Sequence, residues 1–169
     1  MQRIQWFERN FQFGVPAGML PFYLDRLEGT LVRIEQRVSG IPDEILSYQP
    51  EGKWSVKQHI GHLAEVDEIA TKRVDEMRNG ISPMSPAVFE PKQNYNAQPV
   101  AEVLAYFRNN RTRQLEQYKN LTDHEITLSS LHPRLKVVMT PIDLAMFDAE
   151  HDDHHLVHIK EIIDRQLNK

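Results

Sequence analysis

The chain has 169 residues, 20 Lys and Arg against 24 Asp and Glu, a net charge of −4, no cysteine and eight histidines. Its length predicts a single domain over residues 1–169 that folds without disulfides. The charge balance excludes the basic footprint of a nucleic-acid-binding protein or of one bound to anionic membranes. The missing cysteine excludes disulfide scaffolds, cysteine-ligated zinc, iron–sulfur clusters and cysteine nucleophiles.

The first half of the chain predicts two long helices. Apolar residues recur at spacings of three and four from Pro16 or Pro21 to Val38, and a short helical turn is expected over 42–46. The second helix begins after Ser55, a suitable N-cap, and ends near Arg78, before Asn-Gly. No signal peptide precedes these helices and no stretch approaches about 18 apolar residues, so we expect a soluble cytoplasmic protein without membrane partners.

The second half predicts two more helices. A proline-rich loop over 81–98 leads to a helix over 99–120, with Pro99 at its first position. Thr122 and Glu125 have the spacing of a capping box, and 129–139 is irregular or briefly extended. The last helix extends from Pro141 to about residue 167, with Thr140 as its N-cap.

Four helices of about 20–27 residues predict an all-α fold, a four-helix bundle in which the proline-rich loop joins the second and third helices. The N-terminal segment is too apolar for a free tail, so its aromatic residues are expected to pack on the bundle or on a partner subunit. These residues are Trp6, Phe7, Phe11 and Phe13.

Histidines concentrate on the last helix. At about 100° per residue, His151, His155 and His158 fall within about 60° of one another, on the same side as Leu144 and Ile162. Buried imidazoles cost free energy unless a polar network or a metal ion satisfies them. The spacing of His151 and His155 lets imidazoles on adjacent turns bind one ion.

The second helix offers a third ligand, because His62 lies on its apolar side, with His59 one turn earlier. Three neutral imidazoles with an open fourth position are a typical catalytic zinc site. The sequence therefore predicts a metal site formed by His62, His151 and His155. Zinc is the expected ion, and nickel is the alternative in a purified sample.

Other interpretations stay open for these histidines. His59 or His158 would close a four-ligand structural site, and a hydrogen-bonded histidine core would need no metal. His154 is expected at the edge of the apolar side, and His124 and His132 at the surface.

Polar residues near these histidines are candidates for supporting roles. Asp148, Asp152 or Glu65 could orient an imidazole, although a solvated position is the default for each. Glu65 and Asp67 flank the turn of His62, and either could be a general base, with Glu65 as the weak candidate. The loop over 81–99 is expected to shape the mouth of the site. Surface positions are favoured for Tyr95, Arg73 and Arg108.

Several common motifs are absent. The sequence has no glycine-rich dinucleotide or phosphate loop, no G-x-S-x-G elbow and no H-E-x-x-H. The Glu-x-x-His pattern of di-iron bundles is also missing, since Glu150 directly precedes His151.

Two segments together resemble the DinB superfamily, and its YfiT-type branch in particular. The first is KWSVKQHIGHLAE over 53–65, and the second is EHDDHHLVHI over 150–159. The first helix, over 20–30, is also similar, so the resemblance covers most of the chain.

This resemblance implies an up-down-down-up bundle, one divalent ion on His62, His151 and His155, and a homodimer. It also implies a small-molecule substrate and a metal-dependent activity, either hydrolysis or transfer of a low-molecular-weight thiol. The alternative is a non-catalytic bundle with a structural metal or a metal-free histidine core.

Overall fold

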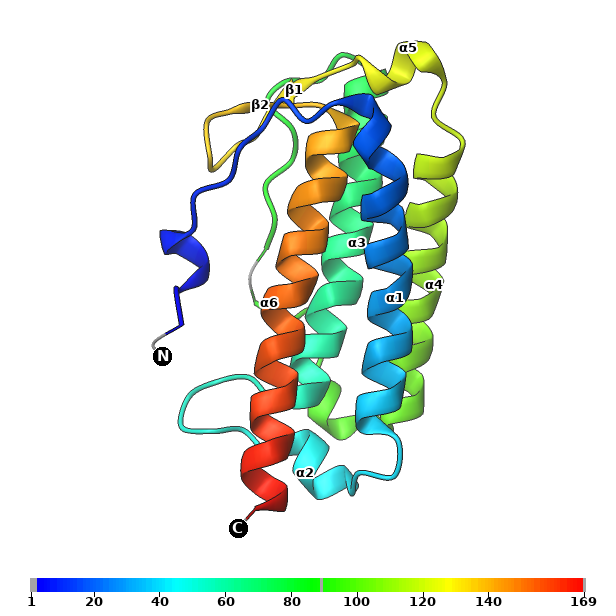
Figure 1. The fold of residues 1–169 in the computed structure, drawn as a ribbon. Helices are drawn as coiled ribbons and strands as arrows, with labels where there is room; N and C mark the ends of the chain where they lie inside the picture. Colours follow the sequence, from blue (N-terminus) through cyan, green and yellow to red (C-terminus); the bar gives the residue numbers. More distant parts are fainter. Residues whose placement is uncertain (1–2, 89, 169) are drawn as a thin grey trace.

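The computed structural model describes residues 3–88 and 90–168, and four long helices form its bundle (Figure 1). They are α1 (Leu20–Val38), α3 (Val56–Arg78), α4 (Val100–Lys119) and α6 (Pro141–Leu167). The shorter elements are η1 (Trp6–Glu8), η2 (Ala17–Met19), α2 (Asp43–Ser47), η3 (Tyr95–Ala97), α5 (Asp123–Ile126), β1 (Ser130–Leu131) and β2 (Val138–Met139). The predicted all-α fold is confirmed, with β1 and β2 forming a small antiparallel hairpin.

Side-chain caps fix where the helices begin. The Ser55 hydroxyl accepts from the Gln58 N–H, and the Gln58 side chain accepts from the Ser55 N–H, which closes a capping box at the start of α3. Thr140 caps α6 in the same way, as expected. Pro99 is an N-cap, not the first helical residue, because its ψ of 140° is extended and α4 begins at Val100.

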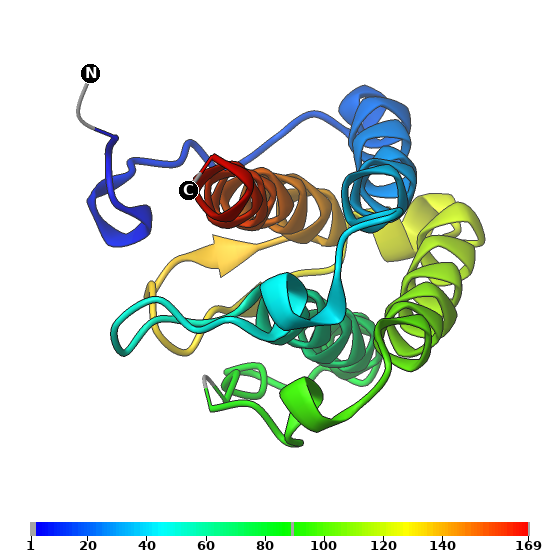
Figure 2. The same ribbon diagram turned by 90° about the horizontal axis from the view of Figure 1, so that it is seen from below.

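The direction of the helices matches the implied up-down-down-up arrangement. In Figure 1, α1 and α6 run downward while α3 and α4 run upward, so α3 and α4 are parallel neighbours. Seen from below in Figure 2, α6 lies between α1 and α3, and α4 closes the square. Since parallel helices cannot be joined by a tight turn, the chain has to return to the start of α4, and the described residues 81–88 and 90–99 lie along α3 (Figure 1).

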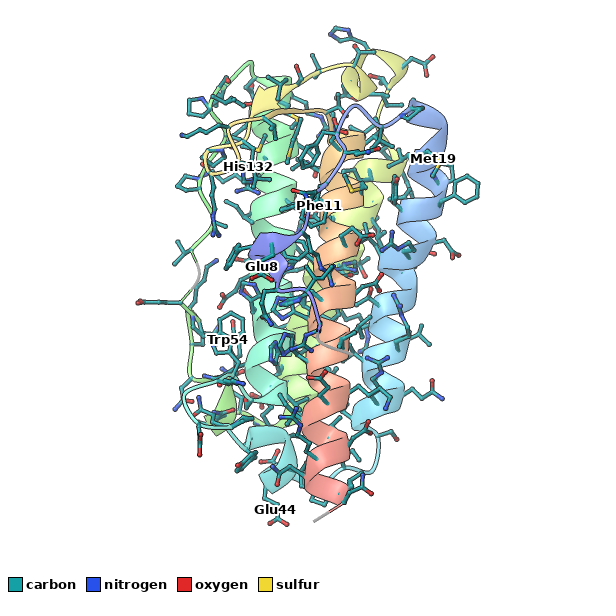
Figure 3. All side chains as sticks on the ribbon, turned by 60° about the vertical axis from the view of Figure 1, so that its left-hand side comes forward. Glu8, Phe11, Met19, Glu44, Trp54 and His132 are labelled. Carbon is teal, nitrogen blue, oxygen red and sulfur yellow. The ribbon has the colours of Figure 1, made fainter. Side chains whose placement is uncertain are left out.

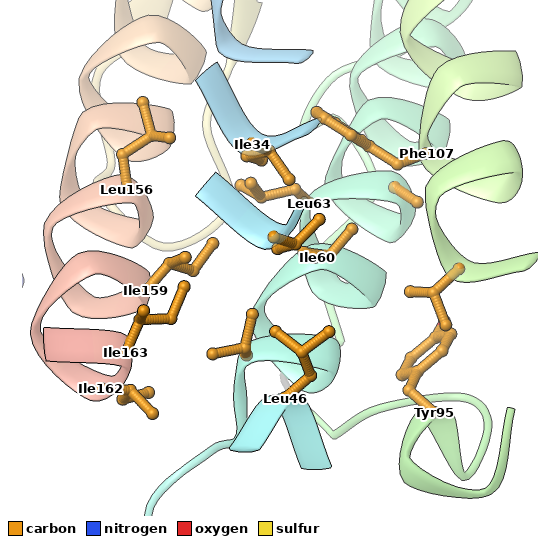
Figure 4. Packing of buried hydrophobic residues seen from close by; sticks show 14 residues of the cluster. Ile34, Leu46, Ile60, Leu63, Tyr95, Phe107, Leu156, Ile159, Ile162 and Ile163 are labelled. Carbon is orange, nitrogen blue, oxygen red and sulfur yellow. The ribbon is translucent and has the colours of Figure 1, made fainter. Parts of the chain in front are cut away.

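Two apolar clusters fill the bundle. One surrounds Ile34, Ile60 and Phe107, and Figure 4 shows it between the lower ends of the helices. The other surrounds Leu27 and Met77 nearer the opposite end. On α3, α4 and α6, a buried charged residue lies between the members of the two clusters.

These charged residues form a buried network. Arg111 on α4 donates to Asp67 of α3 from Nε and Nη2, at 3.0 and 2.9 Å, and to Asp152 of α6 at 2.6 and 3.0 Å. Its Nη1 also donates to the Leu27 carbonyl of α1 at 2.7 Å. Arg111 therefore ties all four helices together. The expected solvated position of Asp152 is wrong, because Asp152 is buried and Arg111 donates a hydrogen bond to each of its carboxylate oxygens.

The crossing segment is held against α3 by acidic side chains. Glu65 Oε1 accepts from the Tyr95 hydroxyl at 2.6 Å and from the Lys92 N–H at 2.7 Å. Nearer the other end, Glu76 accepts from the Ser85 N–H at 2.7 Å. Tyr95 is fully buried, which corrects its expected surface position.

Within the described residues, none of the helices combines the length and apolarity that a membrane span requires.

Candidate metal centre

His62 on α3 faces His151 and His155 on the adjoining turns of α6. One ring nitrogen from each histidine lies within 4.8 Å of the others, and Nε2 of His151 is 3.0 Å from Nε2 of His155. Two nitrogens bound to one tetrahedral zinc ion at about 2.1 Å would lie about 3.4 Å apart, so the spacing fits a shared ion.

Burial keeps these imidazoles neutral, the form that binds metals. Desolvation lowers the pKa of His62 to about 4, and it holds the pKa of His151 and His155 well below the usual value. Nδ1 of His62 and Nδ1 of His151 are buried and have no hydrogen-bond partner among the described residues. The hydrogen bonds among the described residues thus leave two ring nitrogens of the cluster without a partner.

His59 contacts this cluster through His155. Its Nδ1 lies 2.7 Å from Nδ1 of His155, so it can accept a hydrogen bond from the Nδ1–H of His155 while Nε2 of His155 faces His151. This is the position of a residue that orients a metal ligand. His158 stacks on His59 instead of entering the triad, with ring centroids 5.3 Å apart. His154 is half-buried beside His158.

Trp54 covers the same cluster. Its indole is stacked on His155, with centroids 6.0 Å apart and an interplanar angle of 17°, and its centroid lies 4.6 Å from that of His62. The tryptophan comes from the turn directly before α3, so the capping of α3 at Ser55 also fixes this cover.

The carboxylates expected to orient imidazoles bind elsewhere. Asp148 is buried and accepts from Gln114 at 2.9 Å and from the Tyr118 hydroxyl at 3.4 Å. Burial raises its pKa to about 7. Glu65 is bound by the crossing segment, as described above. No local pattern indicates a partner for these carboxylates, and the expected solvated position is wrong for both Asp148 and Glu65, which are buried.

A cavity of about 510 Å³ lies beside the triad, with His62 and His151 on its wall. α3 and α6 supply its floor, and Pro86 and Ala87 belong to its rim, as expected for the segment over 81–99. Figure 3 shows Phe11 of the N-terminal segment and His132 of the hairpin on this side of the bundle.

The N-terminal aromatic residues pack on the bundle, as predicted for most of them. The ring centroids of Trp6 and Phe11 both lie 5.1 Å from that of Phe147 on α6. Phe7 is 68% exposed, but the guanidinium of Arg134 covers its ring at 3.9 Å. This segment thus forms one wall of the cavity.

Two residues expected at the surface are buried in the cavity wall. His132 is buried because the hairpin folds its ring against Phe147, at 5.9 Å between centroids. Arg73 is only 5% exposed. A helical wheel could have found it, because it follows His62 by eleven residues and returns to within about 20° of the same direction. His124 and Arg108 are exposed, as expected.

The fold and the histidine cluster define a helical bundle with a candidate metal centre, and comparison with known proteins gives its family. The model of the DinB superfamily matches residues 26–159, so the chain belongs to the DinB superfamily.

Two similar proteins carry names that refer to a metal. A Bacillus pumilus protein, named provisionally as a metal-dependent hydrolase, is 26% identical over 80% of this chain and 82% of its own length. An Oceanobacillus iheyensis protein with the same provisional name is 27% identical over 82% of each chain.

Solved structures share the fold. YfiT from Bacillus subtilis, titled a probable metal-dependent hydrolase with an unusual four-helix bundle topology, matches with a TM-score of 0.80 at 20% identity, over 94% of this chain and 93% of its own. A mycothiol-dependent maleylpyruvate isomerase matches with a TM-score of 0.66 at 13% identity, over 90% of this chain and 68% of its own.

Proposed function

We propose that this chain is a metal-dependent enzyme in which His62, His151 and His155 hold one divalent ion, zinc in the first place and nickel as the alternative. The substrate is a small molecule, and the reaction is hydrolysis or transfer of a low-molecular-weight thiol. The names of the relatives support a metal and, in one structural neighbour, a thiol.

The observation that carries this proposal is the convergence of three neutral imidazoles within 4.8 Å at the wall of a cavity. A divalent ion bound there would supply the Lewis acidity that activates a water or a thiol. Three protein ligands leave a coordination position for such a group.

Other residues of this chain would orient the metal ligands and shield the site from water. His59 holds the ring of His155 in one orientation, and Trp54 shields the far side of the triad from water. Trp6, Phe11 and Phe147 give one wall of the cavity an apolar surface, which binds water poorly. Water exclusion of this kind strengthens electrostatic interactions within a site.

A structural metal or a metal-free histidine core is the alternative. A closed structural site would need a fourth ligand from His59 or His158. Nδ1 of His59 is already directed at His155, and His158 stacks behind His59, which favours an open site.

The first experiment measures metal content by mass spectrometry on untagged protein that was purified without a chelator. About one divalent ion per chain is expected in the wild type and much less in His151→Ala. His124→Ala is the matched control, because that histidine is exposed on α5. No metal in the wild type after incubation with zinc would refute the proposal.

A second experiment separates an open from a closed site. In a cobalt-substituted sample, an added small thiol should change the visible absorption spectrum if a coordination position is exchangeable. An unchanged spectrum would favour a structural ion.

The homodimer and the cytoplasmic location remain predictions.

A further inference from the structure

Arg73 is a buried cation that lacks an ion-pair partner. It is 5% exposed, and its Nε donates to the Ser85 carbonyl at 3.0 Å, but within the described ranges no carboxylate oxygen lies within 4.0 Å of it. Arg111, the other deeply buried arginine, has two carboxylates. A buried charge without a partner is costly, so such a guanidinium is expected to meet an anion from outside the chain.

The carboxylates nearest to Arg73 are bound elsewhere. Asp148 supports the charge of Arg73 at longer range but receives hydrogen bonds from Gln114 and Tyr118. Glu76 is bound to the Ser85 hydroxyl and N–H at the end of the crossing segment. Neither group therefore neutralises the guanidinium directly.

Arg73 lines the same cavity as the triad. His62, Val66, Ile69 and Arg73 recur at spacings of three and four on α3, and all four lie on the cavity wall. The Cα atoms of His62 and Arg73 are separated by about 16 Å along the helix, and the side chains of both residues line this one cavity. A ligand of moderate length can therefore reach from one to the other.

His132 offers a second donor in this cavity. Its Nδ1 accepts from the backbone N–H groups of Arg134 and Leu135, at 3.3 and 3.1 Å, so the neutral ring carries its proton on Nε2. Burial and then the charge of Arg73 lower the pKa of His132 to about 4, which keeps the ring neutral at pH 7. Between this polar end and the triad, Val66, Ile69 and Phe147 make the wall largely apolar. The carboxyl group of Asp148 also lines the cavity, and burial raises its pKa to about 7.

We propose that the cavity binds a small organic carboxylate, whose carboxylate group Arg73 and His132 hold and whose apolar body extends along α3 toward the triad. This inference rests on the proposed function, since it names the substrate class of that site. The planar guanidinium suits a carboxylate because it can donate two parallel hydrogen bonds.

The test compares one probe with its neutral analogue. Binding of 4-phenylbutanoate and of 4-phenylbutanamide to the protein as purified is measured by isothermal titration calorimetry at pH 7.5. The wild type is expected to prefer the carboxylate about 10- to 100-fold, as for hydrogen bonds to a charged group. Arg73→Met should abolish this preference. Arg108→Met is the matched control, because Arg108 is exposed and pairs with Glu35.

Stability separates a binding role from a structural one. Because Met replaces an unpaired buried charge with an apolar side chain, the melting temperature of Arg73→Met should be unchanged or higher. A lower melting temperature would assign Arg73 a structural role and overturn the inference. The inference also fails if Arg73→Met keeps the preference, or if the wild type shows none.

His151→Ala distinguishes this inference from the proposed function. The variant should lose the metal ion but keep its preference for the carboxylate, because Arg73 lies at the other end of the cavity. A wild type without metal that still prefers the carboxylate would refute the metal proposal alone. A metal-loaded wild type without the preference would refute the carboxylate proposal alone.

Discussion

Gly61 lies under the ring of Tyr95, and replacing it with alanine tests how tightly the crossing segment packs on α3. A Cβ at position 61 would lie 2.4 Å from two ring carbons of Tyr95 and 2.5 Å from a third. Ordinary contacts begin near 3.4 Å, so the ring would have to move by about 1 Å. Tyr95 is fully buried, and the movement would strain its hydrogen bond to Glu65.

The expected cost follows from these contacts. Overpacking a buried site costs about 1–3 kcal/mol, and weakening a hydrogen bond to a charged group adds about 1.5–3 kcal/mol. Alanine returns about 1 kcal/mol through its better helix propensity. The net loss in the free energy of unfolding is therefore about 1.5–5 kcal/mol, which lowers the melting temperature by about 4–14 °C for a chain of this size.

Gly29→Ala is the matched control for this experiment. Gly29 also lies inside a helix, α1, but a Cβ there would meet nothing within 4 Å. It should therefore gain up to about 1 kcal/mol. Denaturant unfolding of both variants gives the comparison. Equal stabilisation of the two would refute the packing argument, and in a Tyr95→Ala background the cost of Gly61→Ala should disappear.

Three further predictions concern the buried charges and the triad. Arg111→Met should cost about 3–5 kcal/mol in denaturant unfolding, because it strands two buried carboxylates, and adding Asp67→Asn and Asp152→Asn should restore most of it. The pKa of His132 in the folded protein lies below its unfolded value of about 6.5. As the pH decreases, the unfolded chain therefore binds the proton first, and the free energy of unfolding decreases. From pH 7 to pH 5 the wild type should lose about 2 kcal/mol more than His132→Asn, and parallel profiles would count against this. A chelator should lower the melting temperature of the wild type but not that of His151→Ala, and an equal effect on both would argue against ligation.

Local rules in the sequence predicted the helices well. Ser55 and Thr140 begin α3 and α6 because capping depends only on residues within one turn. The apolar spacing also directed His62, His151 and His155 inward, and the structure brings them together. Whether these three residues bind a metal stays a prediction.

Long-range partners were beyond such rules. By their local sequence, Asp152 and Asp148 resemble ordinary surface acids. Their hydrogen-bond partners Arg111, Gln114 and Tyr118 all lie on α4, and no local pattern predicts these contacts. A loop position predicts an exposed side chain for His132, but the hairpin turns its ring onto Phe147. These errors share one cause, since burial of a polar residue depends on a partner that lies far away in the chain.

The segment that returns along α3 separates two tasks within one chain. Glu76 and Glu65 fasten it near its two ends, and Pro86 and Ala87 contribute to the cavity rim between those fastenings. The composition of the rim can therefore diverge while the four helices and the histidine triad stay as they are. Under the proposed function, selectivity toward ligands would then be adjustable by substitutions in this segment that leave the helices carrying the triad unchanged.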